Sequence, residues 1–430
     1  MTVALIGFAA ILVLAFMRMP LGVALGLIGV VGFSELSNYR AGMSNAARLV
    51  IDSGQSYGLS VVPLFILMGL MVDRGGMAKE LYRAAYTFLG HRRGGLAMST
   101  IVACGMFSAI CGSSLATAAT MSKVSMPEMR RYKYHDSLAT ASIAAGGTLG
   151  ILIPPSVILV IYGLITNASV GKLFIAGVLP GIIGVLFYLA AVLFVVTRNP
   201  EAGPAGDRSN WGERLIALRD VWTTLGLFIF VIGGIYVGAF TPTEAAGMGA
   251  AGAIAIAYFR GALTWKVMLE VCRETTLTTA KLFLVVFGAM IFSNFVNRAG
   301  LPDALLDIAQ SLEIGSMGVI IMIIIIYLLL GCVFESLSMI LLTVPIFAPL
   351  VAGLGFDLVW FGILVVVATE ISLITPPIGM NVFVLKGVLK DVSVGTIFKG
   401  VTPFWVADIV RIILIALVPG IALWLPSMMH

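Results

Sequence analysis

Charged residues are scarce in this sequence. Only 11% of the 430 residues are Asp, Glu, Lys or Arg, and 60% are hydrophobic, whereas a soluble globular protein has about 25% charged residues. This composition excludes an ordinary soluble enzyme. Crossing a bilayer takes about 20 apolar residues, and uncharged stretches of that length recur at Gly94–Ser122, Ser137–Gly171, Leu173–Thr197, Val221–Thr243 and Ile314–Phe334. The sequence therefore predicts an all-α polytopic membrane protein.

Cysteine and histidine are also rare. The sequence has four cysteines and three histidines, and the cysteines form no CxxC pair. Neither a disulfide framework nor a transition-metal site is expected from so few ligands. No histidine lies within a long apolar segment, so we expect a transporter and no enzyme. The net charge of +5 is typical of the cytoplasmic loops of a membrane protein, and no nucleic-acid partner is expected. The apolar N-terminal stretch is longer than the apolar core of a signal peptide, so we expect it to be a first membrane span that is retained.

The sequence repeats itself at a displacement of 222–224 residues. "SVGKLFIAGVLP" at 169–180 returns as "SVGTIFKGVTP" at 393–403. Further pairs at this displacement are Pro154-Pro155 with Pro376-Pro377, Ser114 with Ser336, and Arg74 and Gly76 with Arg298 and Gly300. The pattern predicts one repeat over 1–197 and a second over 221–430, joined by a polar linker at 198–220 that is rich in Pro and Gly.

Basic residues suggest how the two repeats are oriented. Gly94–Ser122 has Arg92-Arg93 before it and Lys123 after it, and a single span with basic clusters at both ends contradicts the positive-inside rule. A re-entrant hairpin would return both flanks to the cytoplasm, whereas an ordinary pair of spans is the alternative. No Lys or Arg occurs from Ala299 to Leu385, so the matching segment 314–356 is expected to open to the other side. The prediction is an inverted-topology repeat with two re-entrant helical hairpins.

Four breaks in the apolar segments are candidate binding elements. They are the Gly112-Ser113-Ser114 tip, the Gly-rich "AAGGTLGILIPPS", "VFESLS" around Glu335, and "TEISLITPPIGMN". The glycines are expected to loosen a helix and each double proline to free carbonyl groups. A helix breaks at membrane depth only where protein or water supplies polar partners. The paired breaks predict two symmetric Na⁺ sites and helix N-termini facing an anion; packing kinks are the alternative.

Three ionisable residues interrupt apolar surroundings and are functional candidates for that reason. Glu335 could ligate Na⁺, carry a proton or pair with a cation. Arg298 could neutralise a carboxylate substrate or brace Glu335, or it could be an interfacial residue that snorkels to the membrane surface. The third candidate is Glu370.

Several motifs resemble the large membrane subunit of the tripartite ATP-independent periplasmic (TRAP) transporters: "GSSLATAATMSKVSMPEM", "AAGGTLGILIPPSVILVIYG", "GCVFESLSMILLTVPIFAPL" and "ITPPIGMNVFVLKG". The resemblance covers nearly the whole chain. It implies an elevator-type transporter of the ion-transporter superfamily, with two hairpins and two broken helices at 94–163 and 282–390 as the transport domain and the remaining helices as the scaffold. It also implies a multi-pass protein of the bacterial inner membrane that imports organic acid anions, such as sialic acids and C4-dicarboxylates, by Na⁺ symport. The implied partners are a small four-helix membrane subunit and a periplasmic substrate-binding protein.

The resemblance also implies site residues. The candidate Na⁺ residues are Gly112, Ser113, Ser114 and Gly147 in the first repeat, and Ser336, Thr375 and Gly379 in the second. The candidate substrate residues are Arg298, Glu335, Ser156 and Asn381. The family often has Asp where this chain has Glu335, which puts direct ligation by this side chain in doubt. A stand-alone Na⁺/anion symporter that needs no binding protein is the alternative function.

Overall fold

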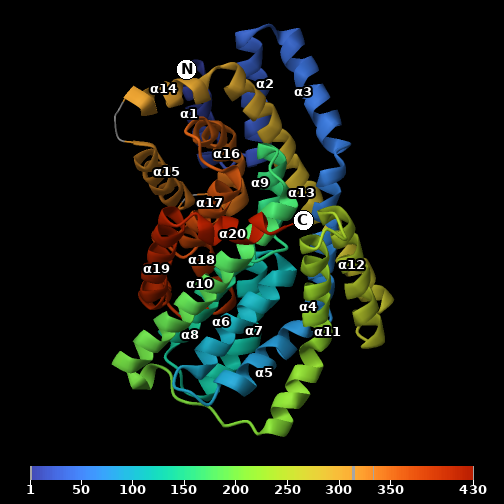
Figure 1. Cartoon of the computed structure of the whole chain (residues 1–430), viewed down its shortest axis with the longest axis vertical. Coiled ribbons are helices and arrows are strands. Elements are labelled where there is room, and N and C mark those ends of the chain that lie inside the picture. Colours follow the sequence, from blue (N-terminus) through green and yellow to red (C-terminus); the bar gives the residue numbers. More distant parts are fainter. Residues whose placement is uncertain (1, 312–314, 333, 430) are drawn as a thin grey trace.

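The computed structural model describes residues 2–311, 315–332 and 334–429 (Figure 1), and all regular secondary structure within these ranges is helical. Residues 314 and 333, which belong to the predicted second hairpin, lie outside the described residues. The helices of the first half are α1 (Thr2–Phe16), α2 (Leu21–Leu36), α3 (Tyr39–Gly54), η1 (Tyr57–Ser60), α4 (Val61–Arg74), α5 (Met77–Leu89), α6 (Gly95–Cys111), α7 (Ser114–Arg131), α8 (Asp136–Thr148), η2 (Leu149–Ile151), α9 (Val157–Thr166) and α10 (Val170–Arg198).

The second half follows the same order from its hairpin onward, because α15 to α19 repeat the order and the breaks of α6 to α10. Its helices are η3 (Pro200–Ala202), α11 (Trp211–Tyr236), α12 (Pro242–Phe259), α13 (Trp265–Arg298), α14 (Leu301–Ser311), α15 (Gly315–Gly331), α16 (Ser336–Gly353), α17 (Leu358–Ser372), α18 (Met380–Val388), α19 (Val394–Leu417) and α20 (Gly420–Ser427).

Within the described ranges, six helices are long and apolar enough to cross a membrane, as length and composition alone indicate. They are η1 with α4, α10, α11, α13, α16 and α19. Helices α6 and α15, with 17 residues each, are shorter apolar helices of the hairpins. The chain is a multi-pass, all-helical membrane protein, as its composition predicts.

The first predicted hairpin is present. Helix α6 ends at Cys111, and Gly112 turns the chain with a left-handed φ of +61°, which glycine adopts without a steric penalty. Helix α7 starts two residues later, and the Ser113 hydroxyl accepts a hydrogen bond from the backbone N–H of Ala116 at 3.4 Å. A serine at this position caps a helix that begins inside the membrane.

Both flanks of this hairpin return to one end of the molecule. The Leu96 N–H at the start of α6 donates to the Tyr134 hydroxyl just beyond α7, at 3.1 Å. The linker also joins the flanks, because the Gly94 N–H donates to the Gly203 carbonyl at 2.8 Å and the His135 N–H donates to the Ala202 carbonyl at 3.1 Å. These bonds exclude a single continuous span over Gly94–Ser122, because both flanks of the hairpin lie at the same end of the molecule, as the prediction requires.

The two broken helices have parallel geometry. Helix α8 passes through η2 into a cis Pro154-Pro155 bond, and α17 leads into a cis Pro376-Pro377 bond. The Ser156 hydroxyl caps α9 by accepting from the Leu159 N–H at 3.2 Å. In the second repeat Gly379, with φ of +59°, precedes α18. Each repeat therefore has a helix interrupted at its double proline.

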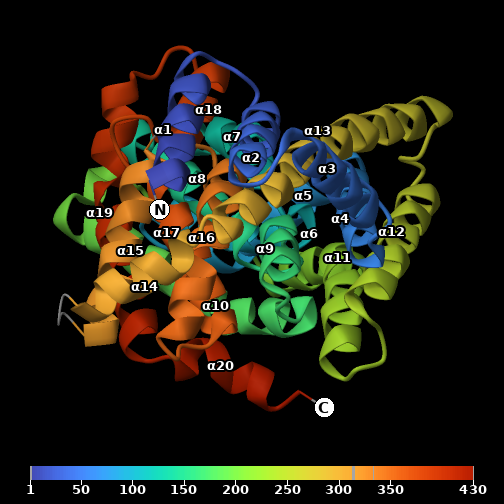
Figure 2. The same ribbon diagram turned by 90° about the horizontal axis from the view of Figure 1, so that it is seen from above.

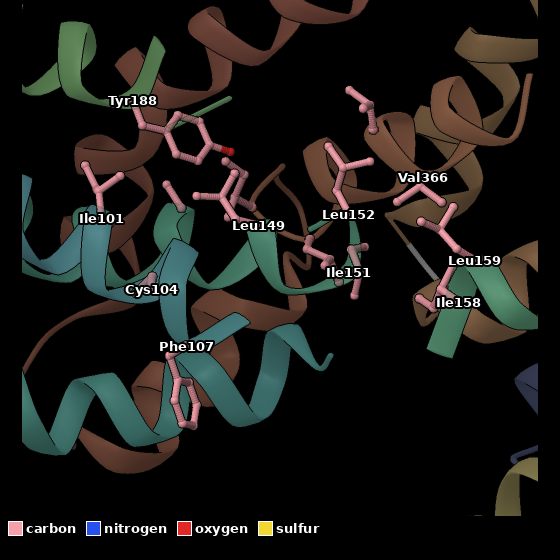
Figure 3. Packing of buried hydrophobic residues seen from close by; sticks show 14 of the residues in the cluster. Ile101, Cys104, Phe107, Leu149, Ile151, Leu152, Ile158, Leu159, Tyr188 and Val366 are labelled. Atoms are coloured by element: carbon pink, nitrogen blue, oxygen red, sulfur yellow. The ribbon is translucent and has the colours of Figure 1, made fainter. Parts of the chain in front are cut away.

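Helices α11 and α12 lie at one flank of the molecule, and α19 lies at the opposite flank (Figures 1 and 2). Between them, helices α2 and α13 cross at glycines: a methyl group on Gly288 would lie only 2.1 Å from the Gly22 carbonyl oxygen. Figure 3 shows the core beside the first break, with Ile101, Cys104 and Phe107 along α6 and with Leu149, Ile151 and Leu152 at the break. This packing fixes the first hairpin against its broken helix.

The irregular part of the predicted linker is shorter than 198–220. Helix α11 begins at Trp211 because Asn210 and Glu213 form a capping box, with reciprocal bonds of 2.8 and 2.9 Å. Such a box pairs two backbone N–H groups at the helix start. Residues 211–220 are therefore the first turns of α11, which are polar in sequence and helical in structure.

Candidate functional site

One cavity of about 260 Å³ brings the two hairpin tips together. It lies between helices of both repeats, so residues more than 200 positions apart in the sequence face the same space. Five of the predicted site residues line it: Gly112, Ser113, Ser114, Glu335 and Ser336. The paired breaks in the sequence correspond to one shared site of this fold.

The first hairpin tip packs backbone to backbone on the first broken helix. A methyl group on Gly150 would lie 3.1 Å from the Ser113 carbonyl oxygen, and one on Gly147 would lie 3.2 Å from the Ser114 carbonyl oxygen. On the other side of the tip, a methyl on Gly112 would lie 3.0 Å from the Pro155 carbonyl oxygen. The glycines allow the close approach. Helix α8 stays regular through Gly146 and Gly147 and ends at Thr148, so the expected loosening is absent at those two glycines, whereas Gly150 lies in the 3-10 turn η2 that follows.

This close approach places main-chain oxygen atoms beside the glycines. The carbonyl oxygens of Ser113, Ser114 and Pro155 lie next to Gly150, Gly147 and Gly112 respectively, and the Ser113 carbonyl also accepts the Thr117 N–H at 3.0 Å. Carbonyl and hydroxyl oxygens are the ligands that hard cations prefer. The arrangement is therefore suited to Na⁺, with Gly147 placed behind the tip and outside the cavity lining.

Two helices begin at this cavity, one from each repeat. Helix α7 starts at Ser114 and α16 starts at Ser336; both serines are about 5% exposed. Glu335 stands at the N-cap of α16 without a side-chain capping bond and is exposed to the cavity. The N-terminus of a helix has a partial positive charge and free N–H groups, so the cavity offers an anion two favourable helix ends.

Helix α13 contributes lining residues that the sequence interpretation missed. Glu274 and Thr278 line the cavity, and Arg74 at the end of α4 donates to the Glu274 carboxylate at 3.3 Å. Their signal in the sequence is the polar run "RETTLTT" at 273–279, inside a long apolar helix. Among the described lining residues the charged ones are Glu274 and Glu335, both acidic.

Three predicted residues in the broken helices lie outside the lining of this cavity. The Thr375 hydroxyl donates to the Ile371 carbonyl at 2.6 Å, and Gly379 supplies the turn before α18. Ser156 is fully buried and donates to the Ile151 carbonyl at 2.5 Å. These side chains shape the breaks, and their part in ligand binding stays a prediction.

Asn381 connects the two repeats. Its buried side-chain amide donates to the Ala144 carbonyl of α8 at 3.0 Å, across 237 positions of sequence. The other amide atom, Oδ1, is buried and has no hydrogen-bond partner among the described residues. A buried acceptor without a partner is costly, so Asn381 has one oxygen free for a ligand.

Arg298 is the predicted site residue that the structure leaves apart. It is the last residue of α13 and is exposed, and it does not line the cavity. Within the described ranges it forms no ion pair with Glu335, which favours the interfacial alternative in this conformation. Its role in substrate binding stays a prediction.

Glu370 is fully buried and forms an ion pair with Arg411 of α19. The carboxylate of Asp408, one turn before Arg411, lies 2.9 Å from the same guanidinium group. The sequence interpretation missed both partners, although an acid and a base three residues apart in an apolar helix give a visible signal.

An exposed ion pair joins the two repeats at the polar end of the first hairpin. Arg130 at the end of α7 contacts Asp391, which follows α18, at 2.5 Å, and it also contacts Asp136 at 3.3 Å. The hydrogen bond from Arg130 lowers the pKa of the Asp391 carboxyl, because it stabilises the charged form. This contact ties the first hairpin to the second broken helix.

The fold is that of an all-helical membrane protein with two hairpins and two broken helices. Solved structures support this fold: the chain is similar to the YdaH transporter of Alcanivorax borkumensis, with a TM-score of 0.63, 15% identity and coverage of 88% of this chain and 89% of that one. MtrF of Neisseria gonorrhoeae gives a TM-score of 0.62 at 13% identity, with coverage of 88% and 84%. At these identities the likeness concerns the fold alone.

The chain belongs to the family described as "Tripartite ATP-independent periplasmic transporter, DctM component", which matches residues 8–421. It is 35% identical to the C4-dicarboxylate TRAP transporter large permease protein of Pseudomonas aeruginosa, over 88% of each chain. It is 33% identical to the sialic acid large permease protein of Vibrio cholerae, over 96% of each, and 33% identical to the ectoine large permease protein of Halomonas elongata, over 97% of each.

Proposed function

We propose that this chain is the large membrane subunit of a Na⁺-coupled secondary importer of organic acid anions, located in a bacterial inner membrane. The observation that carries the proposal is the single cavity in which the N-termini of α7 and α16 meet. Family membership supports transport, since the relatives described above are permeases for C4-dicarboxylates, sialic acid and ectoine. We propose transport without enzymatic chemistry.

The charge of the cavity supports Na⁺ coupling. The charged groups among its described lining residues are the carboxylates of Glu274 and Glu335. Arg74 offsets the charge of Glu274, so Glu335 is the carboxylate that would repel an anionic substrate. Bound Na⁺ ions would offset this repulsion and make anion binding conditional on Na⁺. The two helix N-termini would then orient the substrate carboxylate.

We place the first Na⁺ site at the tip residues Gly112, Ser113 and Ser114 with Gly147 behind them. Its support is the set of hydroxyl and carbonyl oxygens at this tip, which lines the cavity and packs closely on the glycines of the broken helix. The second site, at Ser336, Thr375 and Gly379, is supported by its equivalent position in the second repeat. Both sites would use neutral oxygen ligands, which suits a site that binds and releases Na⁺ in each cycle.

The moving part of the transporter is proposed to contain the hairpins and the broken helices, operating as an elevator. The buried pair between Glu370 of α17 and Arg411 of α19 extends this body to α19. Separating a buried ion pair is strongly unfavourable, so α17 and α19 would move together. This assigns α19 to the moving body, outside the boundary 282–390 that the sequence suggests.

The proposed partners are a small four-helix membrane subunit and a periplasmic binding protein. The description of the relatives as large permease proteins supports a smaller membrane partner. Exposed Trp211, Trp222 and Phe230 on α11 give this flank an apolar surface for lipid or for the small subunit. In this arrangement the binding protein would deliver substrate from outside.

Reconstitution tests the proposal. Proteoliposomes containing this chain and its small subunit would be assayed for uptake of labelled C4-dicarboxylate, sialic acid and ectoine, with and without binding protein. We expect uptake of one substrate class only when the cognate binding protein is present. Uptake without the binding protein would instead establish the stand-alone symporter, and no uptake of any anion in a preparation that exchanges Na⁺ would contradict the proposed substrate class.

A further inference from the structure

Five buried polar side chains outside the cavity lining form a continuous chain of contacts. They are Thr148 of α8, Tyr188 of α10, Glu370 of α17, and Asp408 and Arg411 of α19, and together they are called the central cluster below. All five are fully buried, and within the described ranges the three charged members are the only buried charged side chains. Charged groups in a membrane interior are costly and mark functional positions.

The contacts of the central cluster run from one repeat to the other. Arg411 binds Glu370 and lies 2.9 Å from the Asp408 carboxylate. The Tyr188 hydroxyl donates to the other Asp408 oxygen at 2.6 Å and lies 3.0 Å from the Thr148 hydroxyl. Asp408 is thus the residue that joins the polar pair of the first repeat to the ion pair of the second.

The repeat relates these two pairs. Thr148 and Glu370 have the 222-residue displacement that also relates Pro154 to Pro376, and Tyr188 and Arg411 have the displacement of Pro180 and Pro403. Two equivalent positions from each repeat therefore belong to the cluster. Their side chains are neutral in the first repeat (Thr148 and Tyr188) and charged in the second (Glu370 and Arg411). Gly184 leaves room for the Arg411 side chain, because a methyl group on Gly184 would lie 2.1 Å from the guanidinium.

The central cluster is adjacent in sequence to residues of both predicted Na⁺ sites. Thr148 follows Gly147, where a methyl group would lie 3.2 Å from the Ser114 carbonyl oxygen at the first tip. Glu370 precedes Ile371, whose carbonyl accepts the hydroxyl of Thr375 at the second break. A shift of either broken helix therefore moves one end of the cluster.

We propose that Tyr188, Asp408 and Arg411 are positioning residues that couple the two Na⁺ sites, so that occupation of one site fixes the broken helix of the other. The inference rests on the proposed Na⁺ coupling and goes beyond it by naming the connection. Its physical basis is that the buried charges of α17 and α19 cannot separate without leaving one of them unpaired. Tyr188 extends this connection by donating to Asp408 and contacting Thr148 of α8. The two broken helices are consequently connected through the central cluster.

The test measures the Na⁺ activation curve of uptake in proteoliposomes for Tyr188→Phe. This change removes one hydroxyl group and leaves all charges in place. Because a hydrogen bond to a charged group corresponds to about tenfold in an equilibrium constant, we expect the half-activating Na⁺ concentration to rise about tenfold and the Hill coefficient to fall toward 1. Asp408→Asn, which keeps the shape and removes the charge, should do the same.

Tyr327→Phe is the matched control. Tyr327 is equally buried, and its hydroxyl accepts a hydrogen bond from Thr343 at 2.6 Å, within the second hairpin and outside the central cluster. We expect this variant to keep the wild-type Na⁺ activation curve. If both tyrosine variants change the curve equally, or if Tyr188→Phe lowers only the maximal rate, the cluster has a merely structural role and the inference is overturned.

The wild-type curve separates failure of the inference from failure of the proposed function. Wild-type uptake that does not depend on Na⁺ would overturn the proposed function, and the coupling with it. Wild-type uptake with a cooperative Na⁺ dependence that Tyr188→Phe and Asp408→Asn both retain would overturn the coupling alone. If Asp408→Asn does not reach the membrane, the comparison of Tyr188→Phe with Tyr327→Phe tests the inference on its own.

Discussion

Gly150→Ala is the sharpest test of the contact between the first hairpin tip and its broken helix. The added methyl group would lie 3.1 Å from the carbonyl oxygen of Ser113 and 3.2 Å from the amide nitrogen of Ser114. Both neighbours are backbone atoms, which cannot rotate away as the end of a long side chain can. The tip must therefore move by a few tenths of an ångström.

The size of the effect follows from the packing cost. Overpacking a filled site typically costs about 1–3 kcal/mol. We assign about 1–2 kcal/mol of this strain to the Na⁺-bound form of the tip, which corresponds to roughly five- to thirtyfold in a binding constant.

Na⁺-dependent uptake in proteoliposomes measures this effect. We expect the half-activating Na⁺ concentration of Gly150→Ala to rise by roughly five- to thirtyfold, with similar expression. Gly233→Ala in α11 is the control, because a methyl group there meets nothing within 4 Å. A Gly150→Ala variant with wild-type Na⁺ activation would refute the idea that tip geometry sets Na⁺ affinity.

Three further predictions concern the same site and its surroundings. Ser114→Ala and Ser336→Ala should each weaken Na⁺ activation while leaving expression intact, and unchanged Na⁺ activation in both would count against sites at the hairpin tips. Arg298→Ala should abolish carboxylate uptake if this residue binds substrate in another conformation, whereas wild-type transport would remove Arg298 from the mechanism. The Asp391 carboxyl has a lowered pKa because Arg130 donates a hydrogen bond to it. Its contribution to stability is therefore present above the unfolded pKa of about 4 and is lost as the pH falls through the lower folded value. The thermal unfolding temperatures of the wild type and Asp391→Asn should differ at neutral pH and converge in acid, and a difference that stays constant with pH would contradict the assignment.

The main features of the fold follow from residues visible in the sequence. Apolar stretches without charge predict the membrane helices, because each polar backbone group in lipid must be paired within the chain. The double prolines at 154–155 and 376–377 mark both broken helices, since proline cannot donate the helical hydrogen bond. The basic residues beside 94–122 predict the hairpin, whose flanks the structure joins through Leu96 and Tyr134.

The composition of the site is less accessible from sequence. Gly112 and Ser114 were predicted because they interrupt an apolar run, but Glu274 enters the cavity only through the packing of α13 on the hairpins. Contacts between distant helices depend on crossing geometry, which spacing along one helix does not specify. For this reason the sequence identifies which segments break and leaves open which side chains from intact helices face the breaks.

Charge partners show the same limit. Glu370 stands out in the sequence as a lone acid in an apolar helix, and Asp408 and Arg411 stand out in another. Their pairing requires α17 and α19 to be neighbours, which becomes known only from the fold. Arg298 illustrates the opposite case, because its repeat position and charge suggested the substrate site while the structure places it at the exposed end of α13.

Direct measurement of coupled flux tests the central proposal that this cavity moves an organic anion together with Na⁺. Proteoliposomes containing the chain and its small subunit would receive labelled Na⁺ and labelled substrate together, with binding protein outside and the membrane potential held at zero. We expect substrate influx to require an inward Na⁺ gradient and to proceed with a fixed ratio of Na⁺ to substrate. Equal substrate influx after complete replacement of Na⁺ by choline would contradict the proposal.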